Sequence, residues 1–241
     1  MRMLRQRHRE PEEMDDPAIA TDRLHGALAG LKRLNIASAS ARIVWPPIKR
    51  LARQTKERVR VLDIATGAGD IPIALSRRAK RAGLNLEIHG IDISPRSIDF
   101  ARRQAEAAGA SITFDCRNAL ADELPRDFDV VMCSLFLHHL SDDDALLLLR
   151  RMAAATRCLG LVSDLRRCRY GLFLAYTASR LLSRSSVVHV DAVRSVRAAF
   201  TKSELQQLAV QAGLENAQVA NRWPARMLLK WTKSREQTCY R

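Results

Sequence analysis

Residues 61–70 of this chain read VLDIATGAGD, in which a short apolar strand ends in an acid and runs into a Gly-x-Gly turn. Gly67 and Gly69 let the backbone turn sharply and lie against a ligand where a Cβ atom would clash. A second apolar strand, over 86–91, runs into Asp92, whose carboxylate suits a pair of ribose hydroxyls. This spacing predicts a nucleoside-binding α/β domain.

The residues after the turn discriminate between nucleoside cofactors. A dinucleotide fingerprint has a third glycine where this chain has Pro72. A pyrophosphate needs free N–H groups at the start of the helix, and proline has none. Asp70 would also place a negative charge beside the phosphates. These features disfavour an NAD oxidoreductase and favour S-adenosylmethionine, which carries adenosine and an amino acid without phosphate.

The stretch 61–75, VLDIATGAGDIPIAL, resembles motif I of class I S-adenosylmethionine-dependent methyltransferases. Within that class it is most similar to the small-molecule methyltransferases of the ubiquinone/menaquinone-biosynthesis type. By order of elements the resemblance covers residues 60–231. It implies an α/β, Rossmann-like sheet of seven strands, six parallel and the last antiparallel, with helices on both faces, N-terminal helices and a lid insertion.

The pattern of apolar runs and turn residues fits this fold independently. Strands are predicted over 60–65, 86–91, 112–116, 128–135, 159–164, 217–222 and 226–231. Helices between them have start signals at Ser94 and Ser141, and a capping box of Thr201 with Glu204. Alternating strands and helices predict a parallel sheet that is covered on both faces.

The chain is predicted to be one domain, 17–241, behind a mobile tail, 1–16. Its N-terminal helices span 17–58, with one helix over Thr21 to Leu34 and a second that Pro46-Pro47 breaks. The core spans 59–231.

Residues 165–200 interrupt the strand–helix alternation. Because ligands bind outside the carboxyl ends of the strands, we expect this insertion to form a lid that selects the substrate. Its apolar stretch, flanked by arginines, is either an amphipathic helix resting on an anionic membrane surface or a core helix with solvated ends.

Composition limits the partners. The net charge is +14, from 40 basic and 26 acidic residues, but it is scattered through every predicted helix, which disfavours nucleic acid. No apolar run approaches the roughly 20 residues that span a bilayer. The five cysteines have no CxxC spacing, so free thiols in a cytoplasmic protein are expected, and no metal is predicted. The expected partner is a small-molecule acceptor; the oligomeric state is left open.

The resemblance implies a set of cofactor-binding residues. Asp63 would lie near the amino-acid end of the cofactor, Asp92 would hold the ribose, and Ile93 would pack on the adenine. Asn118 stands where related enzymes place an aspartate, and its amide oxygen can still accept from the adenine amino group. The full set is Asp63, Ala65, Thr66, Gly67, Gly69, Asp92, Ile93, Asn118, Ala119 and Ser134.

The segment 133–144, CSLFLHHLSDDD, resembles the loop that faces the methyl group in these enzymes. A phenol acceptor gains from a base, and His138 or His139 can supply it. The alternative is that one histidine only bonds the backbone of the loop. His189 in the insertion is a further candidate base, and Asp164 can orient a histidine. Arg166, Arg167 and Arg194 are candidate partners for an acidic group on the acceptor.

The sequence therefore predicts an S-adenosylmethionine-dependent methyltransferase acting on a small apolar acceptor. O-methylation of a phenolic, polyketide-like or quinol-like compound is favoured, and C-methylation stays open. The alternatives are an RNA methyltransferase and a non-catalytic protein that binds S-adenosylmethionine.

Overall fold

The computed structural model describes residues 40–214 and 216–233, and in the N-terminal part residues 4, 6–13, 18–20, 22–23, 26–27 and 29–30. The described strands form one seven-stranded sheet. They are β1 (Val59–Ile64), β2 (Leu86–Asp92), β3 (Thr113–Cys116), β4 (Phe128–Ser134), β5 (Thr156–Leu165), β6 (Gln218–Arg222) and β7 (Arg226–Thr232). The helices are α2 (Ser40–Ala52), α3 (Asp70–Arg81), α4 (Pro95–Ala107), η2 (Leu137–His139), α5 (Asp142–Ala155), α6 (Arg169–Leu182), α7 (Ser186–Ala198) and α8 (Lys202–Gln211).

The strands lie in the order β3-β2-β1-β4-β5-β7-β6. Neighbours pair in parallel except β7, which is antiparallel to both β5 and β6. The predicted fold, six parallel strands and a final antiparallel one, is therefore confirmed. The order reverses between β1 and β4, and a crevice opens at such a point beyond the carboxyl ends of the strands.

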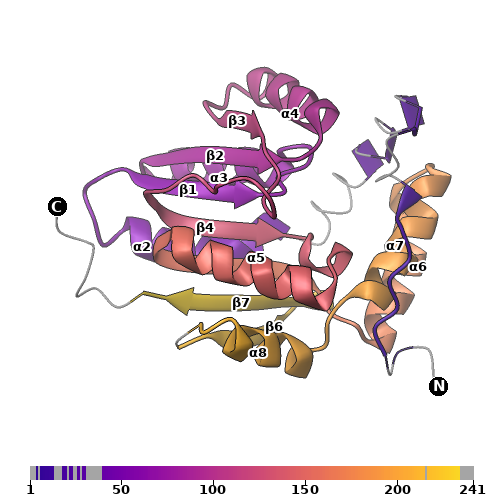
Figure 1. The fold of residues 1–241 in the computed structure, drawn as a ribbon. Helices are drawn as coiled ribbons and strands as arrows, with labels where there is room; N and C mark the ends of the chain where they lie inside the picture. Colours follow the sequence, from indigo (N-terminus) through magenta and orange to yellow (C-terminus); the bar gives the residue numbers. More distant parts are fainter. Residues whose placement is uncertain are drawn as a thin grey trace.

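Two helical layers cover the sheet, with α5 and α8 in front of it and α2 and α3 behind it (Figure 1). The strands alternate between these layers, as expected of side chains with a period of two. In β1, for example, Leu62 and Ile64 pack toward α5, whereas Val59 and Val61 pack toward α2 and α3. Burial on both faces explains why the central strands are almost continuously apolar.

The helix α2 corrects one expectation. The sequence predicts that Pro46-Pro47 breaks this helix, but the structure continues it through both prolines. Two backbone donors are lost there. The helix is instead held by its apolar stripe, because Val44 and Ile48 are buried against the sheet. Of the helix predicted over 21–34, only residues 22–23, 26–27 and 29–30 are described, and they are helical; the rest lies outside the described residues.

The insertion forms the helix pair α6–α7, which stands at one end of the sheet (Figure 1). Residues 6–13, here called the N-terminal strap, run along this pair. The strap belongs to the segment predicted as a mobile tail, yet it makes long-range contacts: the His8 N–H donates to the Arg197 carbonyl at 3.1 Å, and the Glu13 N–H to Asp191 at 2.9 Å.

Cysteine and membrane expectations can be checked over the described part of the chain. Cys116, Cys133, Cys158 and Cys168 are free thiols, and Cys239 lies outside the described residues. Among the helices that the structure describes, none is both long and apolar enough to cross a bilayer.

Candidate functional site

The Gly-x-Gly turn follows β1 as predicted and is held by two acids. Asp63, at 2% exposure, accepts a hydrogen bond from the Thr66 hydroxyl at 2.8 Å. Asp92, at the end of β2, accepts from the Gly67 N–H at 2.8 Å and from the Ser94 N–H at 2.9 Å. The Asp92 carboxylate thus fixes the turn, and it can accept further bonds because each of its oxygens has two lone pairs.

A cavity of about 850 Å³ opens above this turn, at the carboxyl ends of the parallel strands. The helix pair α6–α7 supplies its far wall, through residues such as Leu174, Ala178 and Val196. The cavity brings together every predicted cofactor-binding residue except Gly69, and both histidines of the 133–144 segment. These are Asp63, Ala65, Thr66, Gly67, Asp92, Ile93, Asn118, Ala119, Ser134, His138 and His139.

Gly69 is the predicted cofactor-binding residue that does not line this cavity. A Cβ atom added there would meet the Ala101 side chain at 3.0 Å and the Phe114 ring at 3.1 Å, and its φ is 73°. Gly69 is therefore required by packing against α4 and β3. At Gly67, with φ of 54°, a Cβ would meet nothing within 4 Å and would project into open space. Asp70 is the first residue of α3, and Gly69, not Asp70, occupies the N-cap position.

Buried acceptors beside the turn fit the cationic end of the predicted cofactor. Burial raises the pKa of Asp63 to about 8. The hydrogen bond from Thr66 lowers this pKa, and the carboxylates of Asp70 and Asp92 raise it. Its Oδ1 atom has no hydrogen-bond partner within the described residues, and neither does Ser134 Oγ. Since buried polar atoms are rarely left unpaired, an ammonium group beside Asp63 would satisfy the first of them.

The other end of the turn suits an adenine ring. Ile93 lines the cavity with 62% of its surface exposed, and a flat ring would cover it. Asn118 also lines the cavity, but its Oδ1 accepts from the Leu120 N–H at 2.9 Å. The amide that we expect to read adenine therefore also holds its own turn.

Asp164 holds both the ring and the backbone of His138, which lines the cavity. The short helix η2 places it beside the end of β5, where its Nδ1 lies 2.6 Å from Asp164 Oδ1 and its N–H donates to Asp164 Oδ2 at 2.9 Å. Burial would raise the pKa of Asp164, but the charge of His138, its hydrogen bond and the Leu165 N–H together lower it. Because an ionised Asp164 can only accept, Nδ1 of His138 carries a proton toward it, and Nε2 is the ring nitrogen left for the cavity.

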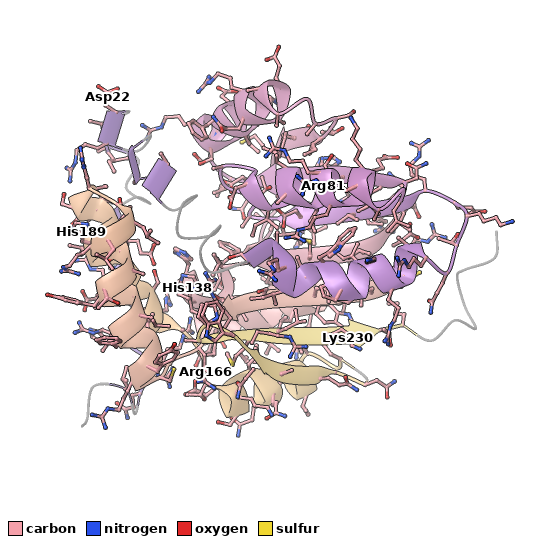
Figure 2. All side chains as sticks on the ribbon, turned by 180° about the vertical axis from the view of Figure 1, so that it is seen from behind. Asp22, Arg81, His138, Arg166, His189 and Lys230 are labelled. Carbon is pink, nitrogen blue, oxygen red and sulfur yellow. The ribbon has the colours of Figure 1, made fainter. Side chains whose placement is uncertain are left out.

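The strap brings a carboxylate to the same place. Glu12 lines the cavity, with its Oε1 3.8 Å from His138 Nε2 and its Oε2 3.9 Å from His139 Nε2. Arg7 of the strap donates to the carbonyls of His138 at 3.0 Å and Leu140 at 2.6 Å. Figure 2 shows His138 between the sheet and the α6–α7 pair.

Comparisons with known proteins agree with this geometry. A family model described as "Methyltransferase domain" matches residues 61–160, which run from β1 into β5. This chain contains a methyltransferase domain. The matched region holds the turn, Asp92, Asn118 and His138, whereas the cavity residues from the strap, the α6–α7 pair and the start of β7 lie outside it.

Relatives of the methyltransferase domain include enzymes of quinone biosynthesis. A ubiquinone biosynthesis O-methyltransferase of Methylocella silvestris is 31% identical over 179 residues, 69% of this chain and 62% of the relative. A demethylmenaquinone methyltransferase of Deinococcus radiodurans is 40% identical over 84 residues, 34% of this chain and 33% of the relative. The match thus covers less than two thirds of the Methylocella silvestris enzyme and about a third of the Deinococcus radiodurans enzyme.

Solved structures share the fold. The S-adenosylmethionine-dependent methyltransferase SibL superposes with a TM-score of 0.63 at 18% identity, covering 84% of this chain and 56% of SibL. The plantazolicin methyltransferase BpumL superposes with a TM-score of 0.60 at 14% identity, covering 89% of this chain and 88% of BpumL.

Some predicted residues are not brought to the cavity above the turn. His189 lies on α7 away from His138 (Figure 2), and its Nε2 is 2.7 Å from the Ser183 carbonyl. Arg167 is buried and pairs with Glu204 at 2.5 Å, while Arg194 pairs with Glu10 at 3.1 Å. Neither these arginines nor Arg166 lines the cavity.

Arg226 and Glu12 are charged residues of the cavity that the sequence-based prediction did not name. Arg226 begins β7, and burial lowers its pKa to about 10 although Asp164 and Asp70 raise it. The sequence contained a signal for Arg226, because the first residue of an antiparallel strand lies at the edge of the sheet where its parallel neighbours end. Glu12 carried no such signal, since only tertiary structure places the strap beside η2.

Proposed function

We propose that this chain is an S-adenosylmethionine-dependent methyltransferase that methylates an oxygen atom of a small, largely apolar acceptor, a phenol or quinol. The observation that carries the proposal is the His138–Asp164 pair, whose histidine lines the same cavity as the turn between Asp63 and Asp92. The cavity therefore combines a cradle for a nucleoside with a buried base.

The cofactor would lie along the turn. Asp63 and Ser134 suit the amino-acid end, Asp92 the ribose hydroxyls, and Ile93 with Asn118 the adenine. When bound, S-adenosylmethionine supplies a methyl group on a sulfonium and leaves as a neutral thioether. The relatives in quinone biosynthesis and the structures of S-adenosylmethionine-dependent enzymes support this assignment.

His138 would act on the acceptor. Its Nε2 takes the proton of the hydroxyl while the oxygen forms its bond to the methyl carbon and the carbon–sulfur bond breaks toward sulfur. Asp164 stabilises the imidazolium that results and keeps the ring in the correct tautomer. The chain must also align the oxygen at about 3–3.5 Å from the methyl carbon. Ala175, Ala178 and Val196 of the α6–α7 wall would hold the apolar body of the acceptor.

Two measurements test the proposal in sequence. Isothermal titration with S-adenosylhomocysteine should show binding to the wild type and strongly weakened binding to Asp92→Ala. Incubation with S-adenosylmethionine and a panel of phenols and hydroquinones should then give methyl ethers, identified by NMR of the product. Absent binding contradicts the cofactor assignment, and ring-methylated products contradict O-methylation.

A further inference from the structure

Three potential ligand atoms from two distant parts of the chain converge at the acceptor end of the cavity. They are one carboxylate oxygen of Glu12 and one ring nitrogen each of His138 and His139, and all lie within 4.8 Å of one another. The separations of 3.8 Å and 3.9 Å between carboxylate and imidazole are too long for hydrogen bonds. A transition-metal ion with bonds of about 2.0–2.2 Å would fit between them after small inward shifts.

The neighbours of these side chains orient them as the outer shell of a metal site does. His138 Nδ1 lies 2.6 Å from the buried Asp164 carboxylate, which leaves Nε2 to coordinate. This carboxylate–histidine pairing accompanies most histidine ligands and fixes their tautomer. On the other side, the Ser195 hydroxyl donates to Glu12 Oε1 at 2.5 Å, and the Glu13 N–H anchors the strap on Asp191.

The charges in this cluster also favour a cation. The side chains of Glu12 and His138 are only 8% and 4% exposed, and Asp164 is buried behind His138. Two carboxylates are thus buried beside two imidazoles, and His138 Nε2 faces the Glu12 carboxylate at 3.8 Å. A doubly charged ion at the centre would bind both groups and balance the charge of the buried acids.

The geometry points to a binding site for a divalent transition-metal ion at Glu12, His138 and His139, with Zn²⁺ as the ion that this donor set favours. Imidazole ligands suit zinc and its neighbours in the first transition row, whereas Mg²⁺ and Ca²⁺ prefer oxygen ligands throughout. Three protein ligands leave coordination positions open. Because all three side chains line the cavity, the open positions face the acceptor.

This site narrows the acceptor class, an inference that rests on the proposed function. An acceptor with two neighbouring oxygens, such as a catechol, can occupy two open positions, whereas a simple phenol can occupy one. A bound cation lowers the pKa of a hydroxyl that it contacts. The hydroxyl proton would then pass to water as the acceptor binds, His138 would serve as a ligand rather than as the base, and the oxygen would take the methyl group as the carbon–sulfur bond breaks toward sulfur.

The test uses the full chain without an affinity tag, stripped with a chelator and titrated with Co²⁺. We expect one strongly bound Co²⁺ per chain, with visible absorption bands that indicate nitrogen and oxygen ligands. Glu12→Gln should weaken Co²⁺ binding by roughly 10- to 100-fold or more, the scale seen when metal sites lose even an outer partner. Gln can still accept from Ser195, so the strap should stay in place. His139→Asn is a second variant with the same expectation.

Glu13→Gln is the matched control, because Glu13 is the next residue of the strap and pairs with Arg23 at 3.4 Å instead of the histidines. Its Co²⁺ affinity should equal that of the wild type. S-adenosylhomocysteine binding is measured on every variant and should not change, because the ligand atoms lie at the acceptor end.

The outcomes separate this inference from the proposed function. Absent Co²⁺ bands, or wild-type Co²⁺ affinity in Glu12→Gln, would overturn the metal site. If the chelated enzyme then still methylates phenols, the proposed function stands with His138 as the base. If the wild type fails to bind S-adenosylhomocysteine, the proposed function fails whatever Co²⁺ does. Zn²⁺ should stimulate turnover of a catechol more than that of a monophenol, and equal stimulation would overturn the assigned acceptor class.

Discussion

The two ends of the cavity are built in different ways. At the end proposed for the cofactor, each side chain lies at or just beyond the carboxyl end of a strand: Asp63 is the second-last residue of β1, Asp92 is the last residue of β2, and Asn118 comes two residues after β3. At the acceptor end, the side chains come from the strap, η2, the α6–α7 pair and β7, and they meet only through tertiary packing. The first end is fixed by the sheet, and the second by segments added to it.

This difference means that the two ends can change independently. A strand end is positioned by the backbone ladder of the whole sheet, so the cofactor residues can hardly move without loss of the fold. The strap and the α6–α7 pair contain no strand of the sheet. Their side chains can therefore vary while the turn between Asp63 and Asp92 is retained. We therefore expect substitutions to separate cleanly into those that affect cofactor binding and those that affect the acceptor.

The largest expected effect is at the acceptor end. His138→Gln removes Nε2 as a base or ligand, and we expect kcat to fall by about 10²- to 10⁴-fold. The dissociation constant of S-adenosylhomocysteine should stay within about twofold of the wild-type value, because the turn is untouched. Stopped assays of methyl transfer and isothermal titration measure the two quantities. His189→Gln is the control and should retain activity, because the His189 ring contacts the Ser183 carbonyl and not the cavity. A joint loss of binding and turnover in His138→Gln would contradict the separation of the two ends.

The second effect is at the cofactor end. Asp92→Ala removes the carboxylate that holds the Gly67 and Ser94 N–H groups and that we expect to bind the ribose. Charge-assisted bonds contribute about 1.5–3 kcal/mol each, so S-adenosylhomocysteine affinity should fall by roughly 10- to 100-fold or more. Thermal unfolding should show a lower Tm as well. Asp99→Ala, on α4, removes a surface carboxylate paired with Arg102 and should change neither quantity. Wild-type affinity in Asp92→Ala would rule out the ribose role.

The same contrast explains what the sequence could predict. The turn, Asp92 and the strand order follow from local patterns. A strand that ends in an acid and a Gly-x-Gly turn fixes the path of the backbone, and it also fixes which edge of the sheet faces the ligand. Strand boundaries differ from the predicted ones by three residues at most, at the start of β5. The capping box of Thr201 and Glu204 is present as predicted.

The failures have a different physical origin. Gly69 fits the turn pattern, but the constraint on it comes from Phe114 and Ala101, which the pattern does not contain. His189 lies in the insertion as expected, yet the rotation of α7 directs it to a carbonyl instead of the cavity. Glu12 could not be found because only long-range contacts, such as Arg7 to the His138 carbonyl, bring the strap to the site.

The third prediction concerns pH and sharpens the cofactor end. The pKa of Asp63 is raised to about 8, so this acid is largely protonated at neutral pH in the free protein. An ammonium group beside it favours the ionised form. Binding of S-adenosylhomocysteine should therefore release up to one proton near pH 7, and affinity should rise by up to roughly tenfold per pH unit below pH 8.

Isothermal titration in buffers of different ionisation enthalpy measures that proton. Asp63→Asn is the control, because it keeps the shape and cannot ionise, and the ligand's own ammonium titrates equally in both proteins. The same shift predicts that Asp63 stabilises the ligand-free fold fully below pH 4 and loses this contribution as pH rises through 8, since the unfolded chain releases the proton earlier. Equal proton release in wild type and Asp63→Asn would contradict the raised pKa.

The smallest expected effect tests how firmly the strap positions the acceptor end. Arg7 donates to the carbonyls of His138 and Leu140 and lies 3.7 Å over the Phe200 ring. Arg7→Ala removes these bonds, so the strap that carries Glu12 should be held less tightly. We expect kcat/KM for the acceptor to fall by about 3- to 10-fold, equivalent to about 1 kcal/mol, with unchanged S-adenosylhomocysteine affinity. Arg9→Ala changes an exposed residue of the same strap and should have no effect. Because Arg7 contacts the backbone of η2 and not the cavity, a loss confined to acceptor kinetics would show that the strap acts through the position of Glu12 and His138.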